Sequence, residues 1–288
     1  MYLVGNFKLL SSSKAFYSMR FNHLSLFFFM FFCCCINAQS TASKEINTFT
    51  IEAPQLKTFK KIWVYLPKNY QNSEKAYPVI YMHDAQNLFD NETAYAGEWQ
   101  VDEYLNTLSQ NESIIIGIAH GNEKRIEELT PYKHEKYGGG QGEAYVTFIK
   151  NTLKPHVDVT YRTKPKAEHT TIFGASLGGL ISFYAAIKYP ETFGKAGVFS
   201  PSFWFSEEIY ELAKSVDIPA TSKFYFLVGD KESDTMVPDQ IRMVNLLKTK
   251  GVNDNQIESH IIKDGQHNEK LWRENFAAAY DWLFTKAN

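Results

Sequence analysis

One short stretch restricts the possible folds of this chain more than any other part of its 288 residues. Residues 170–186 read TTIFGASLGGLISFYAA, a β-branched run that passes into an amphipathic run through Ser176. The central G-x-S-x-G pattern is typical of a nucleophile elbow, a sharp strand-to-helix turn that exposes a serine hydroxyl. Small residues around Ser176 let strand and helix approach closely, and the helix N-terminus favours negative charge beside the hydroxyl. A glycine-rich helix start that packs tightly against a neighbour is the alternative interpretation.

Strand-like and helix-like runs alternate through the rest of the chain. Runs such as YPVIYMHD and SIIIGIAH are continuously apolar, which is typical of strands covered on both faces. The expected strands cover residues 48–54, 57–67, 77–84, 113–120, 169–174, 195–200, 223–229 and 256–265. The expected helices cover residues 98–110, 143–157, 177–189, 206–216, 238–251 and 269–284. This alternation predicts an α/β fold with a mostly parallel central sheet flanked by helices, and an antiparallel N-terminal hairpin.

The N-terminal part of the sequence does not have the pattern of a folded domain. Residues 19–40, MRFNHLSLFFFMFFCCCINAQS, begin with basic side chains, continue in an apolar block and reach small residues at Ala38. This order predicts a secretory signal peptide within residues 1–38, with Met19 as a candidate initiator, followed by a single domain over residues 39–288. The apolar block is shorter than a typical membrane span. A permanent N-terminal anchor is the alternative.

Cysteine content and charge exclude several function classes for the mature chain. All three cysteines lie at positions 33–35, so a chain that starts near Gln39 has no disulfide, thiolate nucleophile or thiolate metal site. The leader carries three basic residues and no acid, so its removal changes the formal net charge from −2 to −5. Mixed charges with a mildly acidic balance argue against nucleic acid as a partner. We expect no stable membrane span after processing, and the sequence leaves the oligomeric state open.

The C-terminal part of the chain offers the base and the acid that a serine nucleophile needs. In an elbow fold these follow the serine in the order acid, then histidine, at the ends of later strands. The run DKESD after the strand KFYFLVG offers Asp230, Glu232 and Asp234. His260 falls in the middle of an expected strand, whereas His267 lies in the loop before the last helix. His267 is therefore the predicted base, and the choice among the three acids stays open.

Backbone amides at two turns are candidates for binding the oxyanion of an acyl-transfer reaction. The amide of Leu177 follows the serine and points at the same spot, and a second amide is expected from the turn HDAQNLFD. His83 and Asp84 are adjacent at a strand end, where side chains diverge, so no metal site is expected there. The stretch YGGGQGEAY follows no expected strand and lacks the lysine of a P-loop, which favours a flexible loop near a pocket over a phosphate cradle.

From roughly Phe49 to the C-terminus, the chain resembles the Putative esterase family of α/β-hydrolases. This family includes enterochelin-type siderophore esterases, feruloyl and acetylxylan esterases, and S-formylglutathione hydrolases. The resemblance rests on the motifs YMHDAQNLFD, LKPHVDVTYRT, FGASLGGLISFYAA, FSPSFWF, LVGDKESDTMV and DGQHNEKLW. Carried over by position, it implies Ser176 as nucleophile, His267 as base and Glu232 as the orienting acid. Asp230 and Asp234 flank that acid, and some relatives work with little help from an acid.

The resemblance also implies an oxyanion hole and a substrate pocket. The backbone amides of Gln86 and Leu177 would form the oxyanion hole, although many relatives have glycine where Ala85 stands. Trp204 in SPSFWF resembles a pocket-wall residue, and Arg125 in GNEKRIEELTP resembles a position that faces the cleft. For both of these side chains, packing or a surface position is the alternative.

Together these observations predict an exported serine esterase that cleaves a carboxylic ester through an acyl-enzyme, with no metal or organic cofactor. Export disfavours the cytosolic S-formylglutathione branch, which leaves small-molecule siderophore lactones and feruloyl or acetyl esters on glycans. The motifs YMHDAQNLFD and LVGDKESDTMV resemble the siderophore branch more closely than the xylan-acting one. A non-catalytic module that holds a glycan or siderophore in the same cleft is the alternative from another class.

Overall fold

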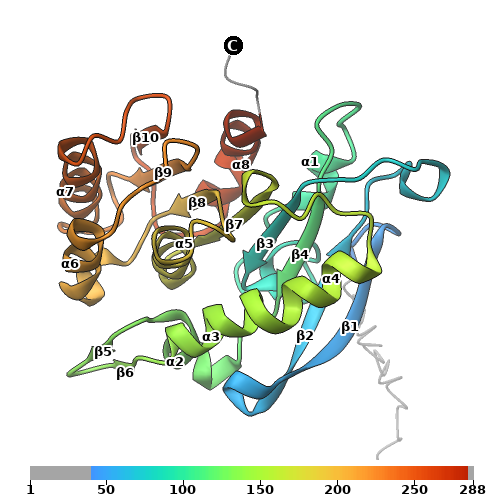
Figure 1. The fold of residues 1–288 in the computed structure, drawn as a ribbon, viewed down its shortest axis with the longest axis horizontal. Helices are drawn as coiled ribbons and strands as arrows, with labels where there is room; N and C mark the ends of the chain where they lie inside the picture. Colours follow the sequence, from blue (N-terminus) through green and yellow to red (C-terminus); the bar gives the residue numbers. More distant parts are fainter. Residues whose placement is uncertain (1–39, 285–288) are drawn as a thin grey trace, which may run out of the picture. The chain divides into compact units, whose positions relative to one another are not determined.

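One eight-stranded sheet forms the centre of the protein, whose computed structural model describes residues 40–284. The strand order is β1-β2-β4-β3-β7-β8-β9-β10 (Figure 1). The strands are β1 (Ile46–Ala53), β2 (Thr58–Tyr65), β3 (Val79–His83), β4 (Ile114–Ile118), β7 (Thr170–Ala175), β8 (Lys195–Phe199), β9 (Lys223–Gly229) and β10 (Ile257–Ile262). Each of them coincides with one of the eight runs predicted as strands.

The strand directions agree with the predicted mixture of one antiparallel edge and a parallel body. β1 and β2 form the expected antiparallel hairpin, and β2 is also antiparallel to β4. Every other neighbouring pair in the sheet, from β4 to β10, is parallel. Because parallel strands end at the same edge, the loops after β3, β7, β8, β9 and β10 open on one side of the sheet, where ligands bind in open α/β folds. The predicted fold class is confirmed.

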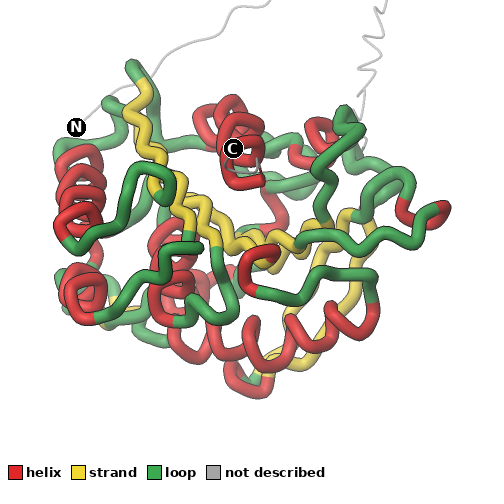
Figure 2. The backbone as a smooth tube through the Cα atoms, turned by 45° about the horizontal axis from the view of Figure 1, so that its top comes forward, coloured by secondary structure: helices red, strands yellow, loops and turns green. Residues whose placement is uncertain are grey.

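Helices cover both faces of the sheet, as strands buried on both sides require (Figure 2). The helices are α1 (Val101–Leu105), α2 (Arg125–Leu129), α3 (Gly142–Phe148), α4 (Lys154–Thr160), α5 (Leu177–Lys188), α6 (Glu208–Ser215), α7 (Met236–Thr249) and α8 (Glu269–Phe284). One hydrophobic core contains residues of helices α3, α4, α5, α6 and α7 together with alternate strand residues such as Val79 and Tyr81. The other core joins α1 and α8 with the opposite set, such as Ile80 and Met82. Because successive side chains of a strand point to opposite faces of the sheet, the core is divided into two layers, one on each face.

Helix α5, which follows the serine, differs from the predicted amphipathic helix. Residues Leu177–Ile187 are all buried, although the predicted pattern left one face for solvent. The helix lies against β7 and β8 on one side and is covered by α2, α3 and α6 on the other. A helix enclosed in this way holds the turn before it rigidly.

The region predicted as one helix over residues 143–157 contains a change of helical geometry. α3 passes through a π-helical segment at Ile149–Leu153 into α4, which contains Pro155 near its start. Proline has no N–H to donate to the carbonyl four residues earlier and its ring crowds that position, so a wider turn before it relieves the clash. The helix continues to Thr160 for this reason instead of ending at the proline.

The glycine-rich stretch forms more regular structure than the predicted flexible loop. Two short strands, β5 (Lys133–His134) and β6 (Gly138–Gly139), form an antiparallel hairpin that precedes α3. Gly138, Gly139 and Gly140 have φ angles of 75°, 89° and 101°, in the region that favours glycine. The three glycines therefore let β6 and the residue after it adopt backbone angles that other residues rarely take.

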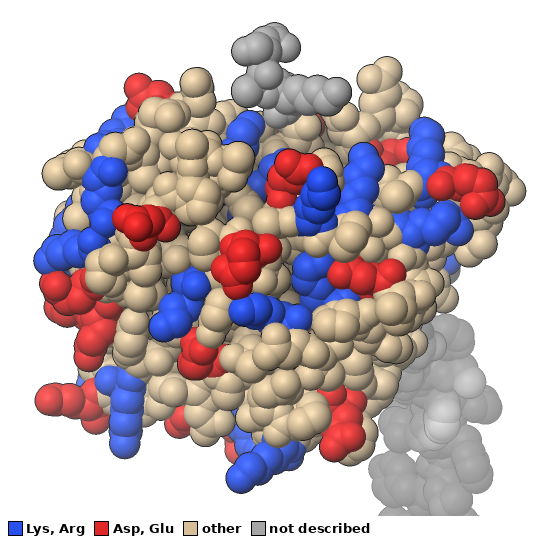
Figure 3. All heavy atoms as spheres, in the orientation of Figure 1, with Lys and Arg blue, Asp and Glu red and all other residues tan. Residues whose placement is uncertain are grey.

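The predicted signal peptide, with its cysteines and the candidate initiator Met19, lies outside the described residues. Within residues 40–284, no helix has the length and apolar character needed to cross a membrane. On the face seen in Figure 3, basic and acidic side chains are interspersed.

Candidate active site

Ser176 occupies a strained turn between β7 and α5. Its backbone angles, φ 61° and ψ −125°, are rare for a residue with a side chain, and they match the nucleophile elbow that the sequence predicted. A Cβ at Gly174 would lie 2.8 Å from the backbone of Gly178 and 2.9 Å from the His83 ring. A Cβ at Gly179 would lie only 2.5 Å from the carbonyl oxygen of Phe199. The turn therefore closes because these positions carry no side chain.

His267 and Glu232 meet across the ends of β9 and β10. His267 Nδ1 lies 2.8 Å from Glu232 Oε2, and the glutamate side chain is fully buried while the histidine side chain is 36% exposed. Of the three acids left open by the sequence, Glu232 is the one in contact with His267. Asp230 instead accepts a hydrogen bond from the backbone of Asp264, and Asp234 is exposed.

Three groups, the Ser200 hydroxyl, the Gly229 backbone N–H and His267 Nδ1, hold the buried carboxylate of Glu232 in place. The Ser200 hydroxyl and the Gly229 backbone N–H donate to Oε1, at 2.6 and 2.7 Å, and leave Oε2 to His267. Trp272 Nε1 donates to Ser200 Oγ at 2.8 Å, and its ring meets the His267 ring edge to face with centroids 5.1 Å apart. The loop after β8, the end of β9 and helix α8 thus fix the acid and the histidine together.

Ser176 and His267 line one cavity of about 440 Å³ at the carboxyl edge of the sheet. Its wall also includes Trp99 and Trp272, so apolar rings surround a small number of polar groups, as in many ligand sites. The hydroxyls of Ser176 and Ser202 lie 3.5 Å apart at this site, at the outer limit of a hydrogen bond.

Arg125, predicted to face the cleft, does line this cavity. Its Nε and Nη2 atoms donate to the two carboxylate oxygens of Asp84 at 2.7 and 2.9 Å. Burial by itself disfavours the Asp84 carboxylate, but the adjacent guanidinium outweighs it and holds the pKa of Asp84 below its usual value. Asp84 also has a left-handed φ of 57°. The pair therefore brings balanced charge into the cavity wall, and the substrate-binding role of Arg125 stays a prediction.

The remaining predicted site residues lie around this cavity. Leu177 is the first residue of α5, so its N–H belongs to the helix end that has no partner within the helix. Gln86 lines a neighbouring cavity, and its side-chain Oε1 accepts a hydrogen bond of 3.2 Å from the His120 backbone. The oxyanion role of both amides stays a prediction.

Trp204 does not line the Ser176 cavity. It is 44% exposed and packs with Tyr137, His134 and Phe205, at centroid distances between 5.7 and 6.3 Å. The hairpin of β5 and β6 supplies two of these rings, because the chain turns back at residues 135–137 between the two strands. The structure therefore places Trp204 in a surface cluster two residues beyond Ser202, and its substrate-binding role stays a prediction.

His83 is buried at the end of β3, beneath the elbow. Its Nδ1 lies 2.8 Å from the hydroxyl of Tyr145, and burial lowers the pKa of His83 to about 4. The ring is therefore neutral near pH 7. Among residues 40–284, no group of three or more His, Cys, Asp or Glu side chains could hold a metal ion.

Sequence reasoning gave no role to Ser200 or Trp272, although both lie in the quoted motifs. Ser200 has a left-handed φ of 42°, which is uncommon for serine and marks a constrained turn. No local sequence pattern predicts that the Ser200 hydroxyl contacts a glutamate 32 positions later.

Comparison with known proteins gives consistent results. The family model described as Putative esterase matches residues 53–283. Uncharacterized protein YbbA of Bacillus subtilis is 29% identical over 243 residues, which cover 79% of this chain and 93% of that protein. An endo-1,4-beta-xylanase/feruloyl esterase of Xylanibacter ruminicola is 26% identical over 220 residues, which cover 73% of this chain and 27% of that protein.

Solved structures share the fold at lower sequence identity. The BES protein from Bacillus cereus has a TM-score of 0.70 at 18% identity, over 86% of this chain and 99% of that one. An IroE-like serine hydrolase from Shewanella oneidensis has a TM-score of 0.69 at 20% identity, over 83% and 80%. The enterobactin esterase FES from Shigella flexneri has a TM-score of 0.69 at 19% identity, over 84% and 59%. The chain therefore belongs to the Putative esterase family, and this membership supports its assignment as a carboxylic ester hydrolase.

Proposed function

We propose that the protein is a serine esterase in which Ser176 attacks the ester carbonyl, His267 is the general base and Glu232 orients the histidine. The observation that carries the proposal is the 2.8 Å contact of His267 with Glu232, combined with His267 and Ser176 lining one cavity. An ionised carboxylate only accepts hydrogen bonds, so Nδ1 of His267 carries the ring hydrogen. Nε2 is then left as the acceptor for the serine proton.

The proposed reaction proceeds in two acyl-transfer steps. As Ser176 Oγ attacks, its proton passes to His267 Nε2, and Glu232 stabilises the resulting imidazolium. The amides of Leu177 and Gln86 bind the oxyanion, and each such donor typically contributes 10²–10³ in rate. Nε2 then protonates the leaving alcohol, which leaves an acyl-enzyme on Ser176. Water, activated by the same histidine, releases the acid and restores the serine.

A siderophore-type lactone is the proposed substrate class, and a feruloyl or acetyl ester on a glycan is the second candidate. The first is supported by the sequence motifs and by the fold shared with the enterobactin esterase of Shigella flexneri. The second is supported by the relative from Xylanibacter ruminicola, whose name includes a feruloyl esterase. Product release from a catecholate trilactone, methyl ferulate and acetylated xylan, measured side by side, distinguishes them.

Hydrolysis of 4-nitrophenyl acetate tests the serine mechanism directly. We expect Ser176→Ala to reduce kcat/KM by at least about 10³, because the nucleophile is removed. Ser215→Ala, at the exposed last residue of α6, is the matched control and should retain full activity. Equal rates for wild type and Ser176→Ala would rule out the mechanism and favour a binding module.

We also propose that the protein is exported, on the basis of its N-terminal sequence. Expression of the full chain in a bacterial host followed by N-terminal sequencing of the exported form checks this. A mature chain starting near Gln39 is expected, and retention of the leader on a membrane-bound protein contradicts it.

A further inference from the structure

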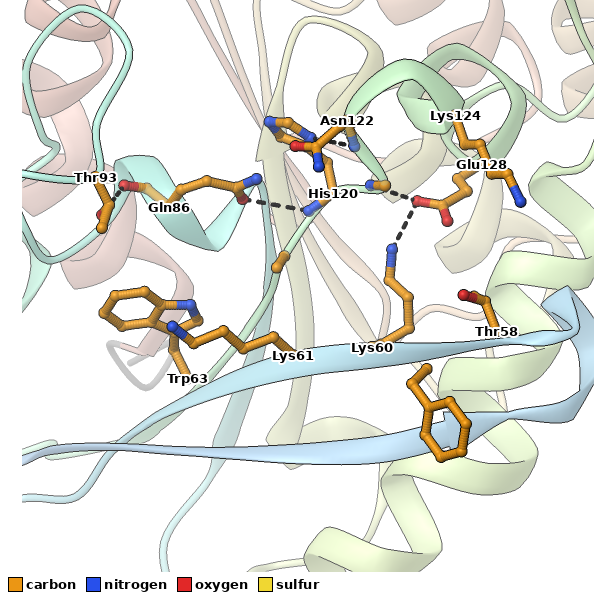
Figure 4. Close-up of a pocket in the computed structure, with 13 residues that line it drawn as sticks. Thr58, Lys60, Lys61, Trp63, Gln86, Thr93, His120, Asn122, Lys124 and Glu128 are labelled. Carbon is orange, nitrogen blue, oxygen red and sulfur yellow. Dashed lines mark hydrogen bonds and ion pairs between the residues drawn. The ribbon is translucent and has the colours of Figure 1, made fainter.

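A second cavity of about 650 Å³, drawn in Figure 4, has a lining residue in common with the cavity that contains Ser176. It lies between strand β2 and the turn that leads into α2. His120 lines both cavities, so they share a wall. The short turn η3 (Ala85–Asn87) divides them, because Asn87 lines the Ser176 cavity while Gln86 lines the second one. His120 is therefore the residue at which the two cavities meet.

The charges that line the second cavity are predominantly positive. Three lysines, Lys60, Lys61 and Lys124, and one acid, Glu128, contribute to its wall. Figure 4 shows Lys60 and Lys61 rising from β2, and Lys124 and Glu128 on the opposite side. His120 adds no charge near pH 7, because burial lowers its pKa. The wall therefore carries an excess of two positive charges.

The single acid in this wall is paired with the third lysine, Lys60. Glu128 Oε2 accepts a hydrogen bond of 2.7 Å from Lys60 Nζ and one of 2.9 Å from the Gly121 backbone. A Cβ at Gly121 would lie 2.7 Å from Glu128, so glycine is needed for this approach. Both charged side chains are more than nine-tenths buried. The pair is thus part of the cavity floor and leaves the other two lysines unbalanced.

Lys61 and Lys124 have no carboxylate partner among the described residues. Lys61 Nζ lies 4.5 Å from the centroid of the Trp63 ring, which also lines the cavity. Lys124 forms no ion pair within residues 40–284. The side chains of Thr58 and Asn122 add further polar groups to the wall. Figure 4 shows Lys61 beside Trp63 on one side of the cavity and Lys124 beside Glu128 on the other, so each lysine is a separate candidate partner for a carboxylate.

We propose that the second cavity binds a carboxylate carried by one half of the ester substrate, with Lys61 on one side or Lys124 on the other as its cationic partner. The inference rests on the proposed esterase function and names a substrate class for it. The carboxylate belongs either to the acyl half or to the alcohol half, because the shared wall allows the ester to lie in either direction. An ester with an anionic arm is therefore held at two places, at Ser176 and beyond His120.

Two pairs of substrates with matched shape test the proposal in the complete protein. The acyl pair is mono-4-nitrophenyl adipate and neutral 4-nitrophenyl hexanoate. The alcohol pair is 4-acetoxybenzoate and neutral 4-acetoxybenzamide. In Lys61→Gln/Lys124→Gln we expect the anionic-to-neutral ratio of kcat/KM to fall about tenfold for one pair, mainly through KM. The pair that responds identifies the half that carries the carboxylate. Lys166→Gln, at an exposed position that lines neither cavity, should leave both ratios unchanged.

Unchanged ratios for both pairs in the double variant overturn the inference, and so does an equal loss on anionic and neutral esters. If the wild-type protein hydrolyses none of the four esters, the proposed function fails separately. In that case, calorimetric titration with adipate tests whether the second cavity binds a carboxylate. Binding by wild type that is weakened about tenfold in the double variant supports the carboxylate site. Equal binding by the two proteins, or no binding by wild type, overturns it.

Discussion

Ser200 Oγ donates a 2.6 Å hydrogen bond to Glu232 Oε1, the carboxylate oxygen that does not face His267. The serine itself accepts a hydrogen bond from the Trp272 indole. The position of the acid therefore depends on two side chains that approach it from the loop after β8 and from α8. Buried carboxylates held by several donors keep one orientation, which is what a histidine partner requires.

Replacement of Ser200 by alanine should therefore disturb the position of Glu232 without changing the side chain of Ser176 or His267. We expect Ser200→Ala to lower kcat about tenfold with little change in KM, because Glu232 loses one of its three donors. The pH profile of kcat/KM should shift as well, since the histidine partner is altered. Ser215→Ala, at the exposed end of α6, should keep the wild-type profile. An unchanged profile in Ser200→Ala contradicts the prediction.

The charge of Glu232 is expected to matter more than its volume. Glu232→Gln keeps the size of the side chain but removes the negative charge opposite His267. We expect kcat to fall by about 10²–10⁴, because the amide does not stabilise an imidazolium and permits the wrong tautomer. Steady-state kinetics with 4-nitrophenyl acetate measure this loss. Asp234→Asn, at an exposed acid two positions away, is the matched control, and a comparable loss there would contradict the assignment.

Glycines at the elbow differ in how strictly they are required. Gly179→Ala places a Cβ 2.5 Å from the carbonyl oxygen of Phe199 at the end of β8, whereas the nearest atom to a Cβ at Gly178 is 3.3 Å away. We expect Gly179→Ala to lower the free energy of unfolding by about 2–3 kcal/mol and Gly178→Ala by about 1 kcal/mol or less. Chemical denaturation of the two variants gives the comparison. Equal losses would show that the helix start moves to accommodate either methyl group.

The buried His83 predicts a specific loss of stability in acid. Its pKa is about 4 in the folded protein and 6.5 in the absence of burial. Between these values the unfolded chain binds a proton that the folded protein does not, so the free energy of unfolding decreases as the pH falls from 6.5 to 4. The loss amounts to about 3 kcal/mol and stops below pH 4.

Urea denaturation of wild type and His83→Asn at several pH values tests this linkage. The asparagine amide retains a polar group near Tyr145 but does not titrate. The variant should show a shallower dependence on pH between 6.5 and 4. Parallel curves for the two proteins would assign the acid sensitivity to other groups.

Both side chains of the Lys60–Glu128 ion pair are buried, with exposed fractions of 3% and 4%. Removal of one partner leaves an uncompensated charge, so Lys60→Met should cost about 3–5 kcal/mol of the free energy of unfolding. Lys60→Met/Glu128→Leu should regain most of this loss, because no unpaired charge is left. Thermal and chemical unfolding of the single and double variants measure the coupling. A double variant as unstable as the single one contradicts the explanation.

The local features of this protein could be predicted from its amino-acid sequence. All eight strands, the antiparallel first hairpin and the parallel body follow from hydrophobic period and from turn residues. The turn at Ser176 was predictable for the same reason, because it needs only small neighbours next to a strand and a helix. Each of these signals lies within about a dozen consecutive residues.

The contacts between residues far apart in the sequence became visible only in the folded chain. Asp230, Glu232 and Asp234 are equivalent in sequence, and the path of the loop after β9 directs one of them to His267. The hydroxyl of Ser200 reaches Glu232 because β8 and β9 are adjacent strands, and the second cavity exists because β2 faces the start of α2. Such contacts depend on the packing of whole elements, and no short window of sequence contains both partners.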